Sequence, residues 1–313
     1  MADGCRSVEE VLSTERETGR GIGGAQPSAL AEAPGSKLKR LSVSQLKAYE
    51  NCPRQWYLRY IRNLPTPPSP DGFVGQMVHH ALRDFMLLPP GQRKPEYLHE
   101  RLREHWRNDH KGRKGFADPG HEASFGRRAM DLLDNFYAGS DLGVVPKEVE
   151  KFLDWSWPFP VPAGDGSGNG GGGGGSGLIM AGKIDRIDER PDGTVEIVDY
   201  KTGHVPPSDE YARRDLQVGL YWSMVQEVLG YRVASFKLLG LAEYRELAVE
   251  LSPEDVQSHL HRAADVVARI RTDVNPQPRV SALCPWCGYL ADCPEREAAE
   301  GFTKDKSLAE LPF

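Results

Sequence analysis

The sequence lacks three features that would place it in common protein classes. It contains no apolar run of about 18 residues, so we expect no membrane-spanning helix. It lacks an excess of basic residues, with 39 basic against 45 acidic side chains. The chain is therefore not a protein that binds nucleic acid by net charge alone, although a local basic groove is still allowed. It also has no Gly-x4-Gly-Lys-Ser/Thr motif, which excludes a motor of the phosphate-loop type.

Cysteine is scarce and unevenly placed. There are five cysteines, and three of them fall between residues 284 and 293, so a disulfide framework is not expected. The N-terminal stretch MADGCRSVEEVLSTERETGRG lacks the apolar core of a secretory signal peptide. Both features favour a reducing, cytoplasmic setting.

The composition predicts one domain with two tails. Residues 1–37 are rich in Gly, Ala, Ser and charge without apolar periodicity, which predicts a disordered tail. We expect the folded domain over residues 38–298 and a C-terminal tail over residues 299–313. The stretch AGDGSGNGGGGGGSG, residues 163–177, lies between two strand-like segments and is interpreted as a loop insertion. It lacks the Lys-Ser/Thr ending and the following helix of a phosphate-binding loop.

Hydrophobic periodicity predicts a mixed α/β core flanked by helices. Strand-like patterns bounded by turn residues cover 149–161, 178–189, 194–203, 233–241 and 243–252. Apolar residues at helical spacing cover 71–88, 95–109, 122–138, 216–230 and 253–272. Shorter helices are expected around Leu46, with Ser42 or Ser44 as the cap, and over residues 56–61.

The stretch VEIVDYKTG, residues 195–203, carries charges where a strand core is expected. Val195 and Ile197 share one strand face with Asp199 and Lys201, because side chains two residues apart point the same way. If the hairpin is symmetric about its turn at Asp192, Asp185 lies directly opposite Asp199, with Cβ atoms about 5 Å apart. A register slip of one residue would instead place the two carboxylates on opposite faces.

Two facing carboxylates repel each other, so a counter-charge is expected. Hard carboxylate oxygens suit Mg²⁺ or Mn²⁺, and a cation between Asp185 and Asp199 would remove the repulsion. Lys201 could then contact an attacking water or a phosphate oxygen. The alternative is a salt-bridged strand end, in which Lys201 simply neutralises Asp199.

Five ordered motifs together resemble the RecB-like branch of the PD-(D/E)XK nuclease superfamily. Four of them are GQMVHHAL from residue 75, GKIDRID from residue 182, EIVDYKTG from residue 196 and QVGLY from residue 217. The fifth consists of two cysteine-containing segments, NCP and CPWCGYLADCP. The cysteine segments resemble an iron–sulfur subset that includes AddB and a CRISPR-associated nuclease. The resemblance implies a restriction-endonuclease-like fold over residues 38–298. It also implies a metal-dependent exonuclease that acts on single-stranded DNA ends in repair and recombination.

The resemblance also implies residue roles. Asp185 and Asp199 bind the metal, with the Tyr200 carbonyl and His79 as further ligands, and Lys201 is the catalytic lysine. Gln217 and Tyr221 orient DNA or the lysine. An acidic ligand is expected on the first core strand, where Glu150 is preferred and Glu148 is the alternative. Each residue also has an ordinary structural interpretation. His79 could be a helical histidine with its hydrogen bonds satisfied, Gln217 and Tyr221 could form a half-buried helix face, and Glu150 could be a solvated charge on a strand.

Cys284, Cys287 and Cys293 have the short spacing of a metal site, and Cys52 can supply a fourth thiolate. Four thiolates suit either zinc or a 4Fe-4S cluster. The resemblance favours the 4Fe-4S cluster, which would tie the N-terminal helices to the C-terminal end and contribute to folding. The alternative is a set of buried free cysteines.

The segment RQWYLRYIR, residues 54–62, interleaves arginines with aromatic rings. Arg54, Arg59 and Arg62 could contact phosphates while Trp56 stacks on a base, a combination that suits single-stranded DNA. The alternative is a solvated helix face with its aromatic residues in the core.

Two rival functions remain open. One is a CRISPR adaptation nuclease that trims spacer precursors and needs a partner integrase. The other is a non-catalytic iron–sulfur scaffold that binds DNA, which the intact set of Asp185, Asp199 and Lys201 argues against. Because the chain has no phosphate-loop motif, any unwinding would require a partner helicase.

Overall fold

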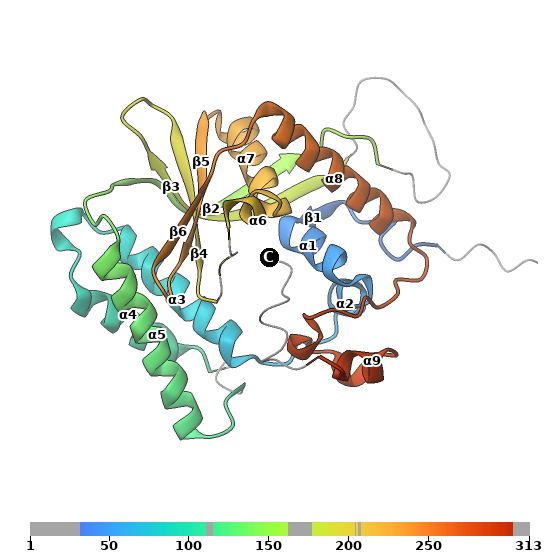
Figure 1. Cartoon of the computed structure of the whole chain (residues 1–313), viewed down its shortest axis with the longest axis horizontal. Helices are drawn as coiled ribbons and strands as arrows, with labels where there is room; N and C mark the ends of the chain where they lie inside the picture. Colours follow the sequence, from blue (N-terminus) through green and yellow to red (C-terminus); the bar gives the residue numbers. More distant parts are fainter. Residues whose placement is uncertain (1–31, 111–114, 162–176, 204, 206–207, 303–313) are drawn as a thin grey trace, which may run out of the picture. The chain divides into compact units, whose positions relative to one another are not determined.

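A six-stranded mixed sheet forms the centre of the described residues (Figure 1). The strand order is β1-β3-β4-β5-β6, and β2 also pairs with β3. Two pairs, β1–β3 and β4–β5, are parallel, and the other pairs are antiparallel. The strands are β1 Arg40–Ser42, β2 Pro146–Ser156, β3 Ile179–Glu189, β4 Val195–Lys201, β5 Val233–Gly240 and β6 Arg245–Val249.

The structure is a computed structural model, and it describes residues 32–110, 115–161, 177–203, 205 and 208–302. Contacts divide the chain after Glu32, and the described residues from Ala33 onward belong to one unit. Ala33 and Ser36 are already buried, so packing begins before the predicted domain start at residue 38. Residues 1–31 of the predicted N-terminal tail, 163–176 of the predicted loop insertion and 303–313 of the predicted C-terminal tail lie outside the described residues.

Helices cover both faces of the sheet. The α-helices are α1 Val43–Asn51, α2 Pro53–Trp56, α3 Pro70–Met86, α4 Pro95–Asn108, α5 Pro119–Gly139, α6 Asp209–Arg213, α7 Leu216–Leu229, α8 Pro253–Thr272 and α9 Arg296–Glu300. The predicted long helices are confirmed to within a few residues at each end. The short strand β1 and helix α6 were not predicted, and α9 runs past the predicted domain end at residue 298. The predicted mixed α/β class with flanking helices is confirmed.

Local sequence explains where several helices begin and end. Ser42 caps α1 through a capping box with Gln45, as predicted for one of its two candidate caps. Ser252 caps α8 in the same way with Asp255, and Pro253 occupies the first helical position. Helix α7 ends at Gly230, whose φ of 70° is a left-handed conformation that glycine adopts without strain.

The β3–β4 hairpin has the predicted symmetric register about Asp192. Arg186 pairs with Val198, and Ile187 pairs with Ile197. The turn closes at Gly193, which has a φ of 75° and donates its N–H to the carbonyl of Arg190 over 2.9 Å. Continued outward, this register brings Asp185 and Asp199 to the ends of the paired region.

Both faces of β4 are buried, so its side chains divide between two apolar clusters. Val195 and Ile197 pack in the cluster that includes α7 and α8, whereas Val198 and Tyr200 pack with α3 and α5. This strand is therefore covered on both sides, as is typical of sheet centres in α/β folds. Asp199 and Lys201 continue the series that faces α7.

In the part of the chain that the structure describes, no helix combines the length and apolar character required to cross a bilayer.

Candidate active site

The last odd positions of β4 place a carboxylate and an ammonium side by side. Lys201 Nζ lies 2.6 Å from Asp199 Oδ2. Burial raises the pKa of Asp199 above its usual value, and the nearby Asp185 adds to this, although Lys201 opposes both. Burial alone would lower the pKa of Lys201, but the carboxylates of Asp199 and Asp215 raise it. The amine is therefore protonated at neutral pH.

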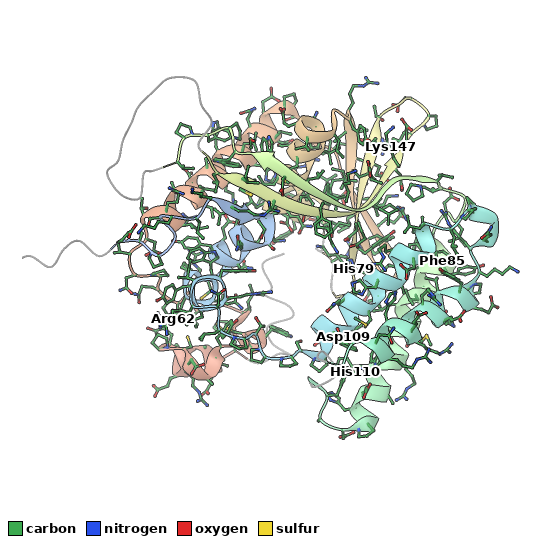
Figure 2. The ribbon with its side chains drawn as sticks, turned by 180° about the vertical axis from the view of Figure 1, so that it is seen from behind. Arg62, His79, Phe85, Asp109, His110 and Lys147 are labelled. Carbon is green, nitrogen blue, oxygen red and sulfur yellow. The ribbon has the colours of Figure 1, made fainter. Side chains whose placement is uncertain are left out.

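Asp185 is held from two sides. Its Oδ1 lies 3.2 Å from His79 Nδ1, and its Oδ2 accepts a hydrogen bond from the backbone N–H of Tyr200 over 2.9 Å. Burial opposes ionisation of Asp185, but the interactions with His79 and then the Tyr200 N–H hold its pKa below the usual range. Helix α3 presents His79 beside the sheet, whereas Phe85 lies farther along the same helix in its apolar cluster (Figure 2).

Helix α7 contributes the residue that orients Asp199. Gln217 Nε2 donates to Asp199 Oδ1 over 2.5 Å. Asp215 caps the helix by accepting from the backbone N–H of Gln217, and Lys47 Nζ donates to Asp215 Oδ2 over 2.7 Å. The ammonium of Lys47 also lies 3.4 Å from Gln217 Oε1, so α1, α7 and β4 are joined in one polar network.

Tyr221 lies one helical turn after Gln217 and packs against β3. A Cβ atom at Gly182 would lie 2.7 Å from Tyr221 Cε1, so glycine is required there for the ring to approach the strand. Burial raises the pKa of the Tyr221 hydroxyl, and the backbone N–H of Lys183 partly opposes this. In this arrangement Tyr221 supports the strand that carries Asp185.

Glu150, not Glu148, lies at the site. One ligand atom each from His79, Glu150 and Asp185 falls within 4.8 Å of the other two. Glu148 instead pairs with Lys151 over 3.0 Å and accepts from the Tyr231 hydroxyl over 3.3 Å.

The backbone of Glu150 has a φ of 52°, in the left-handed region that few non-glycine residues adopt. It lies within β2, between Val149, which pairs with Arg186, and Lys151, which pairs with Ile184 in the same register. Such strained positions occur at functional sites, where the surrounding structure maintains them. Lys183 Nζ forms an ion pair with Glu150 Oε2 and so neutralises its charge.

These donors fit a divalent cation. The set of one imidazole and two carboxylates suits Mn²⁺ well, and the carboxylate oxygens also suit Mg²⁺. Asp199 Oδ2 is buried and, among the described residues, makes no hydrogen bond of proper geometry, although it contacts Lys201 as an ion pair. A cation bound to that oxygen would share it with the Lys201 ammonium. The predicted pair of aspartates is thus supplemented by a closer trio in which Asp185 takes part and Asp199 does not.

The prediction that Trp56 stacks on a DNA base is wrong. Its ring is 1% exposed and packs edge-on against Tyr49 at a centroid distance of 5.3 Å, so it belongs to the core. Of the associated arginines, Arg54 lies over the Tyr57 ring and Arg59 over the Tyr60 ring. Arg62 is exposed on the segment after α2, apart from His79 (Figure 2).

The predicted helix over 56–61 is divided: Trp56 ends α2, and Tyr57–Ile61 forms a π-helical turn. A π turn places successive side chains differently from an α-helix. The alternation of arginines and rings along this segment therefore does not form one continuous surface.

The four cysteines Cys52, Cys284, Cys287 and Cys293 are free thiols that influence one another. Burial raises the pKa of Cys287, and the other three cysteines raise it further, which requires them to be near. Among the described residues, however, only His79, Glu150 and Asp185 form a set with all ligand atoms within 4.8 Å.

Sequence reasoning missed Lys47, Lys183 and Asp215. Asp215 had a local signal, because an aspartate directly before an apolar helical run is a common cap. Lys47 is 168 residues from its partner Asp215, and Lys183 is 33 residues from Glu150, so neither partnership has a local signal.

Comparison with known proteins identifies the family. The model of the PD-(D/E)XK nuclease superfamily matches residues 40–294, which include every site residue described above. A search of curated proteins found no match. A crystal structure described as that of SSO0001 is 12% identical over 82% of this chain and 87% of that chain, with a TM-score of 0.37, a value too low to support any conclusion. Because the family model covers most of the chain, we conclude that the chain belongs to the PD-(D/E)XK nuclease superfamily, a group of divalent-metal-dependent nucleases.

Proposed function

We propose that this nuclease is a RecB-like deoxyribonuclease that acts as an exonuclease on single-stranded DNA ends. The observation that carries the proposal is the convergence of His79, Asp185, Asp199, Lys201 and Gln217 through direct contacts. These residues come from four of the five sequence motifs that resemble RecB-like nucleases. The order and spacing of those motifs support the finer assignment within the superfamily.

The chain's own residues have separate tasks in this proposal. His79, Glu150, Asp185 and Asp199 would hold a Mg²⁺ or Mn²⁺ ion, which supplies an activated water and stabilises charge on the scissile phosphate. The predicted carbonyl of Tyr200 remains a further candidate ligand. Lys201 places a fixed positive charge where charge develops on the phosphate oxygens. Gln217 holds Asp199 in one orientation, so that the carboxylate does not need to reorganise during the reaction.

We also propose that Cys52, Cys284, Cys287 and Cys293 hold a 4Fe-4S cluster. The influence of the other three cysteines on Cys287 supports a common site, and four thiolates are the ligand set of a 4Fe-4S cluster. The same region joins distant segments without metal: Arg54 N donates to the Gln277 carbonyl, and Tyr289 Oη donates to the Leu64 carbonyl. A cluster here would strengthen an existing contact, and free thiols of this kind favour a reducing, cytoplasmic setting.

The biological pathway rests on the same proposal. End processing in DNA repair or recombination would need a partner helicase, because no phosphate-loop motif occurs in the sequence. A CRISPR adaptation nuclease would need a partner integrase instead. The scaffold alternative is disfavoured, because a protein that only binds DNA does not require two buried carboxylates, Asp185 and Asp199, that lie near enough to repel each other.

The test is a nuclease assay on anaerobically purified protein. End-labelled single-stranded and double-stranded DNA would be incubated with Mn²⁺, Mg²⁺ or EDTA, beside a Lys201→Ala variant. We expect metal-dependent degradation of single strands from an end, and its loss in the variant. Mid-strand cutting alone would refute the exonuclease assignment, and metal-independent cutting would refute the site itself.

A further inference from the structure

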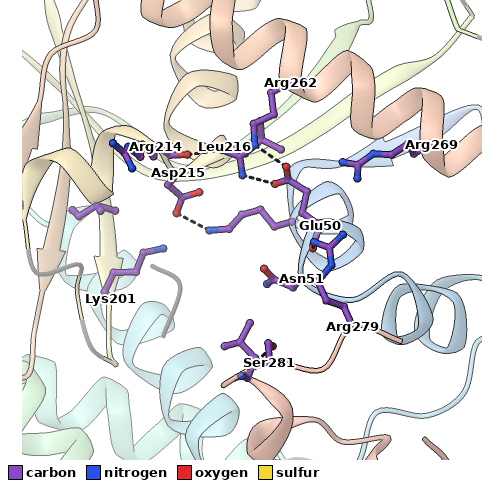
Figure 3. A pocket seen from close by; sticks show the side chains of 13 residues that line it. Glu50, Asn51, Lys201, Arg214, Asp215, Leu216, Arg262, Arg269, Arg279 and Ser281 are labelled. Carbon is purple, nitrogen blue, oxygen red and sulfur yellow. Dashed lines mark hydrogen bonds and ion pairs between the residues drawn. The ribbon is translucent and has the colours of Figure 1, made fainter. Parts of the chain in front are cut away.

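A cavity of about 480 Å³ opens beside Lys201 (Figure 3). Its walls come from α1, the end of β4, the junction of α6 and α7, helix α8 and the segment that follows α8. Six basic side chains line it: Lys47, Lys201, Arg214, Arg262, Arg269 and Arg279. Lys201, Lys47 and Asp215 belong both to this cavity and to the polar network described above, so the cavity adjoins the active site.

The cavity carries an excess of positive charge. Two acidic residues, Glu50 and Asp215, line it beside the six basic ones, which leaves four positive charges. Glu50 pairs with Arg262 over 2.7 and 3.0 Å, and Asp215 pairs with Lys47 over 2.7 Å. The two acids are therefore both engaged. Two of the four remaining cations pair with carboxylates outside the lining, Lys201 with Asp199 and Arg214 with Glu210.

Arg269 and Arg279 are the cations without a carboxylate partner in the described part of the chain. The Arg269 guanidinium lies 5.9 Å from the centroid of the Tyr49 ring. The Arg279 guanidinium donates to the backbone carbonyl of Glu50, and the Arg279 backbone N–H donates to Cys52 Sγ over 3.4 Å. Clustered, unpaired guanidinium groups repel one another, so an anionic ligand would stabilise them. Guanidinium groups match phosphate oxygens in pairs of hydrogen bonds.

The polar side chains that line the cavity and the volume of the cavity limit the class of ligand that it can bind. Asn51 and Ser281 line the same cavity and offer hydrogen-bond donors and acceptors beside the arginines. A volume of about 480 Å³ lies in the range of sites that enclose small organic ligands, whereas inorganic phosphate alone would leave most of it empty. A phosphate that carries a sugar and a base suits both the charge and the volume.

We propose that this cavity binds one nucleotide of the substrate strand next to the scissile phosphate, with the nucleotide's own phosphate on Arg269 and Arg279. The proposal rests on the proposed nuclease function, because Lys201 connects the cavity to the reacting phosphate. The bound phosphate can come from a strand terminus or from the interior of the strand. Both sources have the same chemistry, and the experiment below separates them.

The test compares Arg269→Gln and Arg279→Gln with an Arg127→Gln control. Arg127 is exposed on α5 and lies outside the cavity. Cleavage of short single strands would be measured with a 5′-phosphate, a 3′-phosphate or only hydroxyl ends, over a range of salt concentrations. We expect KM to rise at least tenfold in each cavity variant while kcat changes less than twofold. Each lost phosphate contact should also lower the slope of log KM against log salt by about 0.7.

The substrate ends identify the source of the phosphate. If removal of one terminal phosphate raises KM for the wild-type protein but not for the cavity variants, the cavity takes a strand end. If end chemistry has no effect while the cavity variants still lose affinity, it takes an internal nucleotide. A KM in both cavity variants equal to that of Arg127→Gln overturns the proposal.

Binding in EDTA separates this proposal from the proposed function. Fluorescence anisotropy of a labelled single strand measures affinity without turnover, so it gives a result even for a protein that does not cut. Wild-type protein that binds single-stranded DNA but never cuts it would refute the proposed nuclease function. The cavity proposal could still be tested, because the anisotropy assay compares the affinities of the wild type and the cavity variants. Arg269→Lys and Arg279→Lys keep the charge but lose the paired donors, and they replace the glutamine variants if circular dichroism shows that those do not fold.

Discussion

Asp199 and Lys201 leave β4 on the same face, and Lys201 Nζ lies 2.6 Å from Asp199 Oδ2. The preceding odd positions of the strand are buried apolar side chains, so the ion pair marks the point where an apolar face becomes a polar site. The contact is a salt bridge, as the simplest interpretation of the sequence held. It adjoins a second buried carboxylate, Asp185, and a basic cavity, neither of which a purely structural salt bridge would require.

Lys201→Ala should lower kcat by about 10²- to 10³-fold, the usual effect of removing one group that stabilises developing charge. Single-turnover cleavage with Mn²⁺ measures this effect. Lys147→Ala is the matched control, because Lys147 is a surface lysine that pairs with Glu189. A loss of less than tenfold in Lys201→Ala would contradict the assigned role.

Glu150→Gln should weaken activation by Mn²⁺ at least tenfold, whereas Glu148→Gln should leave it unchanged. Among the residues that the structure describes, the Glu150 carboxylate and not that of Glu148 lies within 4.8 Å of both the His79 and the Asp185 ligand atoms. The stabilisation of the fold by Mn²⁺ should fall in parallel, because an ion that binds only the folded state raises the melting temperature according to its affinity. Equal responses of the two variants would contradict the assignment.

Gln217→Leu should reduce kcat at least tenfold with little change in the affinity for DNA. The substitution removes the donor that holds Asp199 Oδ1 and leaves a buried acceptor without its partner. Gln226→Leu, at an exposed position on the same helix, is the control. A Gln217→Leu variant with raised KM and normal kcat would show that this residue contacts substrate rather than Asp199.

Asp215→Asn should destabilise the fold in a pH-dependent way. Asparagine keeps the helix cap but loses the charge that pairs with Lys47. Burial opposes the charge of Asp215, yet Lys47 and then Lys201 hold the pKa of this carboxyl below its ordinary value of 3.8.

A lowered folded-state pKa means that the charge contributes stability above pH 3.8, and that this stability is lost as pH falls through the folded pKa. The difference in unfolding free energy between wild type and Asp215→Asn should therefore be largest near neutral pH and shrink below about pH 4. Urea unfolding at several pH values measures it. The exposed Asp265→Asn on α8 is the control, and a difference that grows at low pH would contradict the sign.

Cys52→Ser and Cys287→Ser should each abolish the visible absorbance and the bound iron of anaerobically purified protein. They should also lower the melting temperature, because a cluster that joins distant segments stabilises the folded state. Cys5→Ser is the control, since Cys5 lies outside the two cysteine segments NCP and CPWCGYLADCP. Purified protein that contains one zinc ion and no iron would contradict the proposed cluster, but it would still support a common metal site formed by the four cysteines.

The sequence by itself determined the parts of this protein that depend on near neighbours. Period-two alternation set the face on which Asp199 and Lys201 lie, and the turn at Asp192 set the hairpin register. Helix spacing placed Gln217 and Tyr221 one turn apart on α7, because side chains four residues apart share a helix face. Each of these relations is local, since the repeat of the backbone alone produces it.

Only the tertiary structure decided the relations that depend on packing between distant segments. It selected Glu150, with its left-handed φ, over Glu148 by bringing the Glu150 carboxylate close to His79 and Asp185, and it buried Trp56 against Tyr49. It also brought arginines from several segments around one cavity beside Lys201. A local pattern shows which side chains share a face, but the contacts of that face depend on which other elements pack against it.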